Sequence, residues 1–108
     1  MKMIVAVIRQ EKLDAVSKAM KENGFMALTT YEVRGRGEQG GIKLQHRGIA
    51  MDVDLIPKTR VEIVVTDDCE QRAIEIIQDA AWTGKPGDGR IFVLDVAKSI
   101  KVRTGEVA

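Results

Sequence analysis

The sequence predicts an α+β fold in which a strand–helix–strand unit occurs twice. Short apolar runs rich in Val and Ile alternate with amphipathic segments, and glycines or capping residues separate them. Two such units in succession are typical of the ferredoxin-like βαββαβ arrangement, an antiparallel sheet with both helices on one face. The other sheet face would remain uncovered, so we expect this chain to self-associate through it.

The first unit begins with residues 2–8, an apolar run that predicts a buried strand. Residues 11–22 follow as a predicted helix, because apolar side chains recur at i, i+3 and i+7. Asn23 and Gly24 predict the end of that helix. Residues 25–33, with adjacent Thr and Tyr side chains, predict the second strand.

The second unit repeats the order. Residues 60–65 predict a strand, residues 66–82 a helix, and residues 91–96 the last strand. Glu70 stands three residues after Asp67, which is the spacing of a capping box at the start of a helix.

Composition limits the function. The chain has 108 residues, so residues 1–108 are expected to form a single domain. A net charge of +1 argues against general nucleic-acid binding, although it leaves room for a local basic pocket. Cys69 is the single cysteine, and we find neither a signal-peptide pattern nor an apolar run long enough to span a bilayer. These features predict a cytoplasmic protein with no membrane insertion.

A long glycine-containing loop, about residues 37–55, is predicted between the second and third strands. Loops of this length in small domains are usually functional or disordered, and we interpret this one as functional and mobile. Gly35 to Gly40 matches the pattern G-x-G-x-x-G after a strand, but a dinucleotide site would need a helix to begin there, and the Gly40-Gly41 pair disfavours one. The glycines would still let the backbone approach a ligand.

Two further segments are candidates for binding phosphate. Residues 83–90, Thr-Gly-Lys-Pro-Gly-Asp-Gly-Arg, could offer consecutive backbone N–H groups and two cations. The basic segment 98–105 carries Lys101 and Arg103, which would point to the same side of an extended chain. An ordinary connecting loop and a solvated basic tail are the structural alternatives, and spacing alone does not bring the two segments together.

These motifs resemble those of the PII nitrogen-regulatory proteins over essentially the whole chain. The glycine-rich loop and the strand after it, residues 83–93, are similar to the family's phosphate-binding loop, and residues 102–106 to its C-terminal signature. Residues 34–42 also resemble the nitrogenase-linked and archaeal branch of the family. The ends and middle of the family's long loop are matched by Gly35, Gly37, Gln39, Gly41, Arg47, Gly48, Leu55, Pro57 and Lys58.

The resemblance implies a homotrimer, not an enzyme, that binds ATP or ADP with Mg²⁺, and 2-oxoglutarate, in the clefts between subunits. The long loop would then regulate a partner protein such as an ammonium channel, nitrogenase or glutamine synthetase. Gln39 would ligate the magnesium, and Gln39, Gly41 and Lys58 would bind 2-oxoglutarate. The implied nucleotide-binding residues are Thr29, Gly37, Glu38, Gln39, Gly87, Asp88, Gly89, Arg90, Lys101 and Arg103.

The sequence departs from the family at several positions. Met51 stands where many members have a tyrosine that is modified, and a thioether has no hydroxyl to modify. Glu38 replaces a common arginine, and its carboxylate would repel a triphosphate. Lys101 replaces a usual arginine, which keeps the charge but loses the bidentate fork, whereas Arg90 in place of a common lysine should preserve phosphate binding.

Two other functions stay open. One is a PII-like protein with exchanged ligands, sensing ADP or AMP, bicarbonate or a metal, which Glu38 and Met51 favour and which Gln39 and Lys58 disfavour. The other is a small ferredoxin-like enzyme, which is disfavoured because the lone His46 has no acid–base or nucleophile motif to act with.

Overall fold

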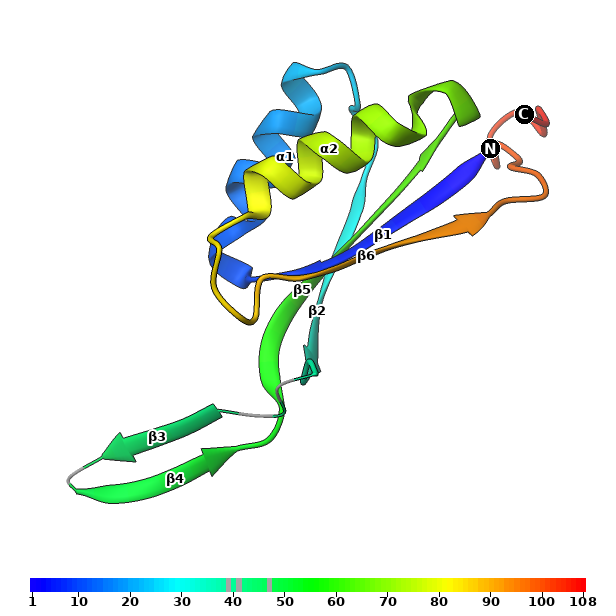
Figure 1. Ribbon diagram of the computed structural model, residues 1–108. Helices are drawn as coiled ribbons and strands as arrows, with labels where there is room; N and C mark the ends of the chain where they lie inside the picture. Colours follow the sequence, from blue (N-terminus) through cyan, green and yellow to red (C-terminus); the bar gives the residue numbers. More distant parts are fainter. Residues whose placement is uncertain (39, 41, 47) are drawn as a thin grey trace.

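The computed structural model describes residues 1–38, 40, 42–46 and 48–108. Its main sheet is four-stranded and antiparallel, in the order β2-β5-β1-β6, and α1 (Leu13–Glu22) and α2 (Glu70–Ala81) both cover the same face of it (Figure 1). This confirms the predicted ferredoxin-like α+β fold. None of the described helices is long and apolar enough to cross a membrane. The strands are β1 (Lys2–Ile8), β2 (Thr29–Gly35), β3 (Ile42–His46), β4 (Ile49–Val53), β5 (Ile56–Val65) and β6 (Gly89–Asp95).

The hydrophobic core lies between the two helices and the sheet. Side chains alternate between the faces of each strand, so every second residue of β1 and β5 points toward the helices. These strand residues meet the apolar faces of α1 and α2, and Phe25 closes the core beside them. The core residues are Ile4, Ala6, Ile8, Val16, Met20, Phe25, Val61, Ile63, Val65, Ala73, Ile77 and Ala81.

The opposite sheet face is uncovered in the single chain. Met3 pairs with both Val64 and Leu94, and Val5 pairs with Phe92, so these residues share the face that points away from the helices. Val64, Leu94 and Phe92 are each nearly half exposed. Exposed apolar side chains gathered on one sheet face are typical of a surface that another molecule covers.

Segment ends differ from the predictions for local reasons. The chain between Phe25 and Thr29 is not strand, and β2 begins only at Thr29, where pairing with β5 starts. β6 begins at Gly89 rather than residue 91, because Gly89 and Arg90 pair with the end of β1. The first helix ends at the predicted Asn23-Gly24, and Gly24 has a φ of 88°.

The capping box at Asp67 was a wrong prediction. A short 3₁₀ turn, Asp67–Cys69, precedes α2, and no side-chain capping bond is made at its start. Asp67 instead accepts a hydrogen bond of 2.6 Å from the N-terminal amine of Met1. Because that carboxylate is held by the N-terminal amine, just before β1, it is not available to the helix N-terminus.

The segment between β2 and β5 contains strands that the sequence did not predict. β3 and β4 pair in antiparallel register, from Ile42 opposite Val53 to His46 opposite Ile49, and form a two-stranded sheet of their own. Figure 1 shows this ribbon projecting from the main sheet at the end where β2 stops and β5 starts. Only the alternating residues of β4 gave a period-two signal in the sequence.

Candidate functional site

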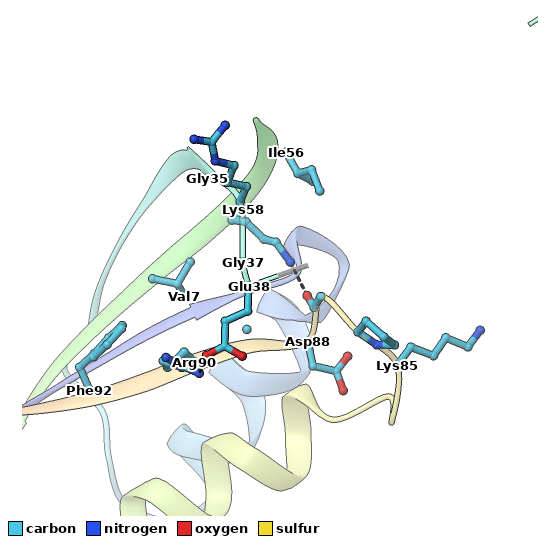
Figure 2. A pocket seen from close by; sticks show the side chains of 14 residues that line it. Val7, Gly35, Gly37, Glu38, Ile56, Lys58, Lys85, Asp88, Arg90 and Phe92 are labelled. Carbon is cyan, nitrogen blue, oxygen red and sulfur yellow. Dashed lines mark hydrogen bonds and ion pairs between the residues drawn. The ribbon is translucent and has the colours of Figure 1, made fainter. Parts of the chain in front are cut away.

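A pocket of about 710 Å³ lies where β1 and β2 end and β6 begins (Figure 2). Its lining includes three apolar side chains, four cationic side chains and the glycine loop that joins α2 to β6. The apolar residues are Val7, Ile56 and Phe92, and the cations are Arg36, Lys58, Lys85 and Arg90. A pocket with these two parts suits a ligand that has both an apolar portion and negative charge.

Asp88 folds the glycine loop onto itself. Its carboxylate accepts hydrogen bonds from the backbone N–H groups of Thr83, at 2.8 Å, and Gly84, at 2.9 Å, and from the Thr83 hydroxyl. The Thr83 hydroxyl and N–H, with further help from Arg9 and the Gly84 N–H, hold the pKa of the Asp88 carboxyl well below its usual range. Asp88 therefore acts on the loop's shape, and its oxygens are already engaged.

Arg9 attaches this loop to the sheet, and sequence reasoning missed it. From the end of β1 it donates hydrogen bonds to Asp88, at 3.0 Å, and to the carbonyl oxygen of Pro86, at 2.9 Å. A cation directly after a buried apolar strand was the available signal, because such a side chain needs an anionic or carbonyl partner nearby.

Two glycines of the loop are required by its geometry. Gly89 has a φ of +110°, and a Cβ there would lie 1.8 Å from the carbonyl oxygen of Val7. Gly87 has a φ of +98°, a backbone conformation that residues with a side chain rarely adopt. Within the described part of the chain, the backbone N–H groups of Gly87 and Asp88 donate no hydrogen bond. They are thus available to an anion, as the N–H groups of a phosphate-binding nest are.

Lys58 brings a partly buried cation to the pocket. Its ammonium donates a hydrogen bond to the carbonyl oxygen of Gly87, as Figure 2 shows. Burial, followed by the nearby positive charge of Arg9, lowers the pKa of Lys58 from its ordinary value. A desolvated cation of this kind gains from an anionic ligand more than an exposed one does.

Two of the remaining cations are paired with carboxylates. Arg90 forms an ion pair with Glu38 at 2.8 Å across the pocket (Figure 2), and Arg36 forms one with Asp54. Lys85 has no ion pair among the residues that the structure describes.

The structure brings together only part of the predicted site. Gly37, Glu38, Lys58 and the loop residues 87–90 all line the pocket. The predicted ligands Gln39 and Gly41 lie outside the described residues. Among the described ones, no group of three or more His, Cys, Asp or Glu side chains lies close enough together to hold a metal ion.

Thr29, Lys101 and Arg103 do not reach this pocket within one chain. Thr29 begins β2, whereas the pocket lies at the Gly35 end of that strand. The basic segment follows β6, whereas the pocket lies at its start, and the seven residues between span about 20 Å. The predicted residues therefore form two groups at opposite ends of the sheet.

The C-terminal segment is folded back rather than extended, which corrects the expected geometry of Lys101 and Arg103. The N–H of Lys101 donates to the carbonyl oxygen of Glu106, and that of Gly105 to Lys101, at 2.9 and 2.7 Å. Gly105, with a φ of +72°, permits the reversal. The two cations are therefore not on an extended chain, and the expectation that they point to the same side does not apply. Lys101 forms an ion pair with Glu106 at 3.5 Å.

Fold and pocket together define a small α+β protein that has a pocket lined by cations and a glycine loop, beside a projecting ribbon. The family model described as "Nitrogen regulatory protein P-II" matches residues 1–106. The chain belongs to this family, which confirms the resemblance.

Individual relatives agree with the family match. A protein named Nitrogen regulatory protein P-II from Klebsiella oxytoca is 48% identical over 106 residues, which cover 98% of this chain and 95% of that protein. Nitrogen regulatory protein P-II 2 from Methanothermobacter thermautotrophicus is 47% identical, covering 98% and 92%. These names describe nitrogen regulatory proteins, and the family match supports a role for this chain in nitrogen regulation.

Proposed function

We propose that this protein binds ATP or ADP with Mg²⁺, and then 2-oxoglutarate, and that nucleotide and 2-oxoglutarate together determine which partner protein it regulates. The observation that carries the proposal is the pocket wall at Gly87 and Asp88, where two backbone N–H groups lie beside several cations. Phosphate groups are bound in this way by loops whose backbone donors and side-chain charges converge.

The two parts of the pocket correspond to the two parts of a nucleotide. Val7 and Phe92 offer apolar surface for the base, and Arg90 and Lys85 offer charge for the phosphates. Planar guanidinium groups bind phosphate in bidentate fashion, which favours Arg90 as the main phosphate contact.

For 2-oxoglutarate, the supporting residue is Lys58. Its ammonium is partly buried and faces the glycine loop, so a carboxylate that enters the pocket could pair with it. We assign Gln39 and Gly41 to the same ligand on the family resemblance, and Gln39 is the residue that would hold Mg²⁺. A bound metal would neutralise phosphate charge and orient the second ligand.

We further propose a cytoplasmic homotrimer in which each nucleotide site is shared by two chains. Two complementary halves of a site at opposite ends of one chain fit a head-to-tail contact, and such contacts close into rings. Thr29, Lys101 and Arg103 of one chain would complete the pocket of the next. The apolar residues Val64 and Leu94 on the open sheet face would be covered in the same assembly.

The segment of residues 37–55 is the proposed contact with the partner. Among the residues that the structure describes, its ribbon of β3 and β4 pairs with no other strand, which leaves backbone edges that could meet another protein. The family resemblance implies three candidate partners: an ammonium channel, nitrogenase and glutamine synthetase. Resemblance to the nitrogenase-linked branch favours nitrogenase.

Calorimetric titration tests the proposal. ATP, ADP and AMP are each titrated with and without Mg²⁺ and 2-oxoglutarate, and light scattering on a sizing column measures the mass. We expect ATP and ADP to bind, 2-oxoglutarate to bind only with MgATP, and a mass of about three times 11.9 kDa. A stable monomer would contradict the shared site.

The second candidate is a P-II relative with exchanged ligands, which the Glu38–Arg90 ion pair specifically favours because a carboxylate occupies a phosphate position. Nucleotide binding without any 2-oxoglutarate binding at millimolar concentration would favour this candidate. Titration with AMP, bicarbonate and divalent metals would then identify the exchanged ligand.

A further inference from the structure

The ion pair between Glu38 and Arg90 spans the pocket, and we propose that Glu38 is a built-in competitor for the phosphate site. Its carboxylate pairs with Arg90, and a nucleotide phosphate that binds Arg90 must replace it there. This inference rests on the proposed nucleotide site and adds a regulatory residue to it.

Arg90 is the cation for which this competition matters most. Its backbone is held in β6 by pairing with Val7, so the guanidinium has a defined position at the pocket. Lys58 is held by the carbonyl oxygen of Gly87, and Arg36 by Asp54. A phosphate that enters against the N–H groups of Gly87 and Asp88 would meet Arg90 next, whose Nη2 lies 2.8 Å from a carboxylate oxygen of Glu38.

The pair is weak enough to be replaced. Glu38 and Arg90 side chains are 83% and 62% exposed, and ion pairs between exposed groups contribute little to stability. A phosphate group brings more charge than the carboxylate and can use both arms of the guanidinium. Once the phosphate is bound, Glu38 lies beside a like charge, so its carboxylate has to move away.

Displacement of Glu38 from Arg90 would affect the base of the ribbon. Glu38 lies in the turn in which the N–H of Gly40 donates to the carbonyl oxygen of Gly37 at 3.0 Å, between β2 and β3. Arg90 belongs to the main sheet. The ion pair thus links the base of the ribbon to the main sheet, and a phosphate bound at Arg90 would break this link.

The test is a double-mutant cycle on ATP affinity, measured by calorimetry with and without Mg²⁺. Glu38→Gln keeps the size of the side chain and removes its charge. We expect it to tighten ATP binding about threefold to tenfold, because the phosphate no longer has to displace a carboxylate from Arg90. In the Arg90→Gln background the same change should alter affinity by no more than about twofold, because the shared partner is gone.

Glu22→Gln is the matched control. Glu22 is an exposed carboxylate on α1 that pairs with Lys18 at 3.8 Å, and its substitution changes the net charge equally but away from the pocket. Its ATP affinity should equal that of the native protein. Hydrogen–deuterium exchange adds a second measurement: without nucleotide, Glu38→Gln should speed exchange at the N–H of Gly40.

Each outcome decides the matter. Equal tightening in both Arg90 backgrounds would overturn the inference, because it would show general repulsion rather than competition for Arg90. Weaker ATP binding by Glu38→Gln would also overturn it and would make Glu38 a direct or metal-mediated ligand. Either result leaves the nucleotide site standing, whereas a failure of the native protein and all variants to bind any nucleotide would overturn both proposals. An unchanged exchange rate at the Gly40 N–H would show that the ion pair does not stabilise the base of the ribbon.

Discussion

Arg9 donates a hydrogen bond from Nε to a carboxylate oxygen of Asp88 at 3.0 Å, and so joins the end of β1 to the glycine loop 79 positions later in the chain. Both side chains are only 24% exposed. The other carboxylate oxygen of Asp88 accepts hydrogen bonds from the N–H groups of Thr83 and Gly84 within the loop. The shape of the anion pocket consequently depends on a carboxylate that is already saturated with donors from the protein.

Asp88→Asn should loosen the loop and weaken nucleotide binding, because an amide offers one acceptor oxygen where the carboxylate offers two. It should also lower the melting temperature by several degrees near neutral pH. The folded-state pKa of Asp88 is lowered, so its stabilising effect is fully present above 3.8, the ordinary aspartate value, and is lost as pH falls below it.

Thermal unfolding at several pH values measures this. The difference in melting temperature between the native protein and Asp88→Asn should narrow below pH 3.8. Asp79→Asn, at an exposed position of α2, is the control and should match the native protein throughout. An equal difference at pH 3 and pH 7 would show that ionised Asp88 is not the cause.

Gly89→Ala should destabilise the fold by more than about 2 kcal/mol, through an unfavourable φ and a clash with backbone. The added Cβ would lie 1.8 Å from the carbonyl oxygen of Val7, inside the β1–β6 pairing. Gly35→Ala is the matched control, since nothing lies within 4 Å of its Cβ position. Chemical denaturation gives both free energies of unfolding, and similar values for the two variants would contradict the geometry.

Lys58→Met should reduce 2-oxoglutarate affinity about tenfold to a hundredfold, the effect of losing a hydrogen bond to a charged group, while ATP affinity changes less. Methionine keeps the aliphatic stem and removes the charge. Lys21→Met, an exposed lysine in the last turn of α1, is the control. Calorimetry measures the affinity of each variant for ATP, and for 2-oxoglutarate with MgATP present. Equal losses of affinity for both ligands would show a general effect on the glycine loop.

The same lysine predicts a pH dependence. The pKa of Lys58 is lowered from 10.5, so its positive charge is present below that lowered pKa and is lost as pH rises through it. The affinity of the native protein for 2-oxoglutarate should therefore fall at an alkaline pH below 10.5. Lys58→Met should lack this fall, and an identical pH profile in the variant would assign it to another group.

Arg103→Ala should weaken ATP binding about tenfold to a hundredfold, through the loss of charge-assisted hydrogen bonds to phosphate. Lys18→Ala removes an exposed cation of α1 and should leave ATP affinity unchanged. Titration of ATP into each variant measures this. An unchanged affinity in Arg103→Ala would mean that the folded-back C-terminal segment is only a solvated end.

Hydrophobic periodicity predicted the repeated strand–helix–strand order well, because burying one face of each element is what determines that order. The ribbon was missed because β3 and β4 form a two-stranded sheet separate from the main one, and apart from the alternating residues of β4 this segment carries no period-two pattern. The Asp67 carboxylate was misassigned because its partner, the amine of Met1, is distant along the chain. Arg9 was missed for the same reason, since its partners begin 77 positions later.

The candidate site was predictable in part. The glycine-rich loop that contains Gly87 and Gly89 could be predicted from the sequence, but the approach of Val7 that requires glycine at position 89 could not. The ion pair of Glu38 with Arg90 could not, because it joins two segments that only the folded sheet brings together. The predicted strand at residues 91–96 already separated the glycine loop from the basic segment, and β6 holds the two at its opposite ends.

That separation has a consequence for mixtures of chains. If neighbouring chains share each cleft, a chain with Arg90→Ala has a defective loop but an intact C-terminal segment, and a chain with Arg103→Ala has the reverse. Any closed ring of three that contains both kinds has one cleft in which the intact loop meets the intact segment. Subunit exchange between two inactive preparations should therefore restore nucleotide binding through inter-subunit complementation, so that the binding site belongs to the assembly rather than to any single polypeptide.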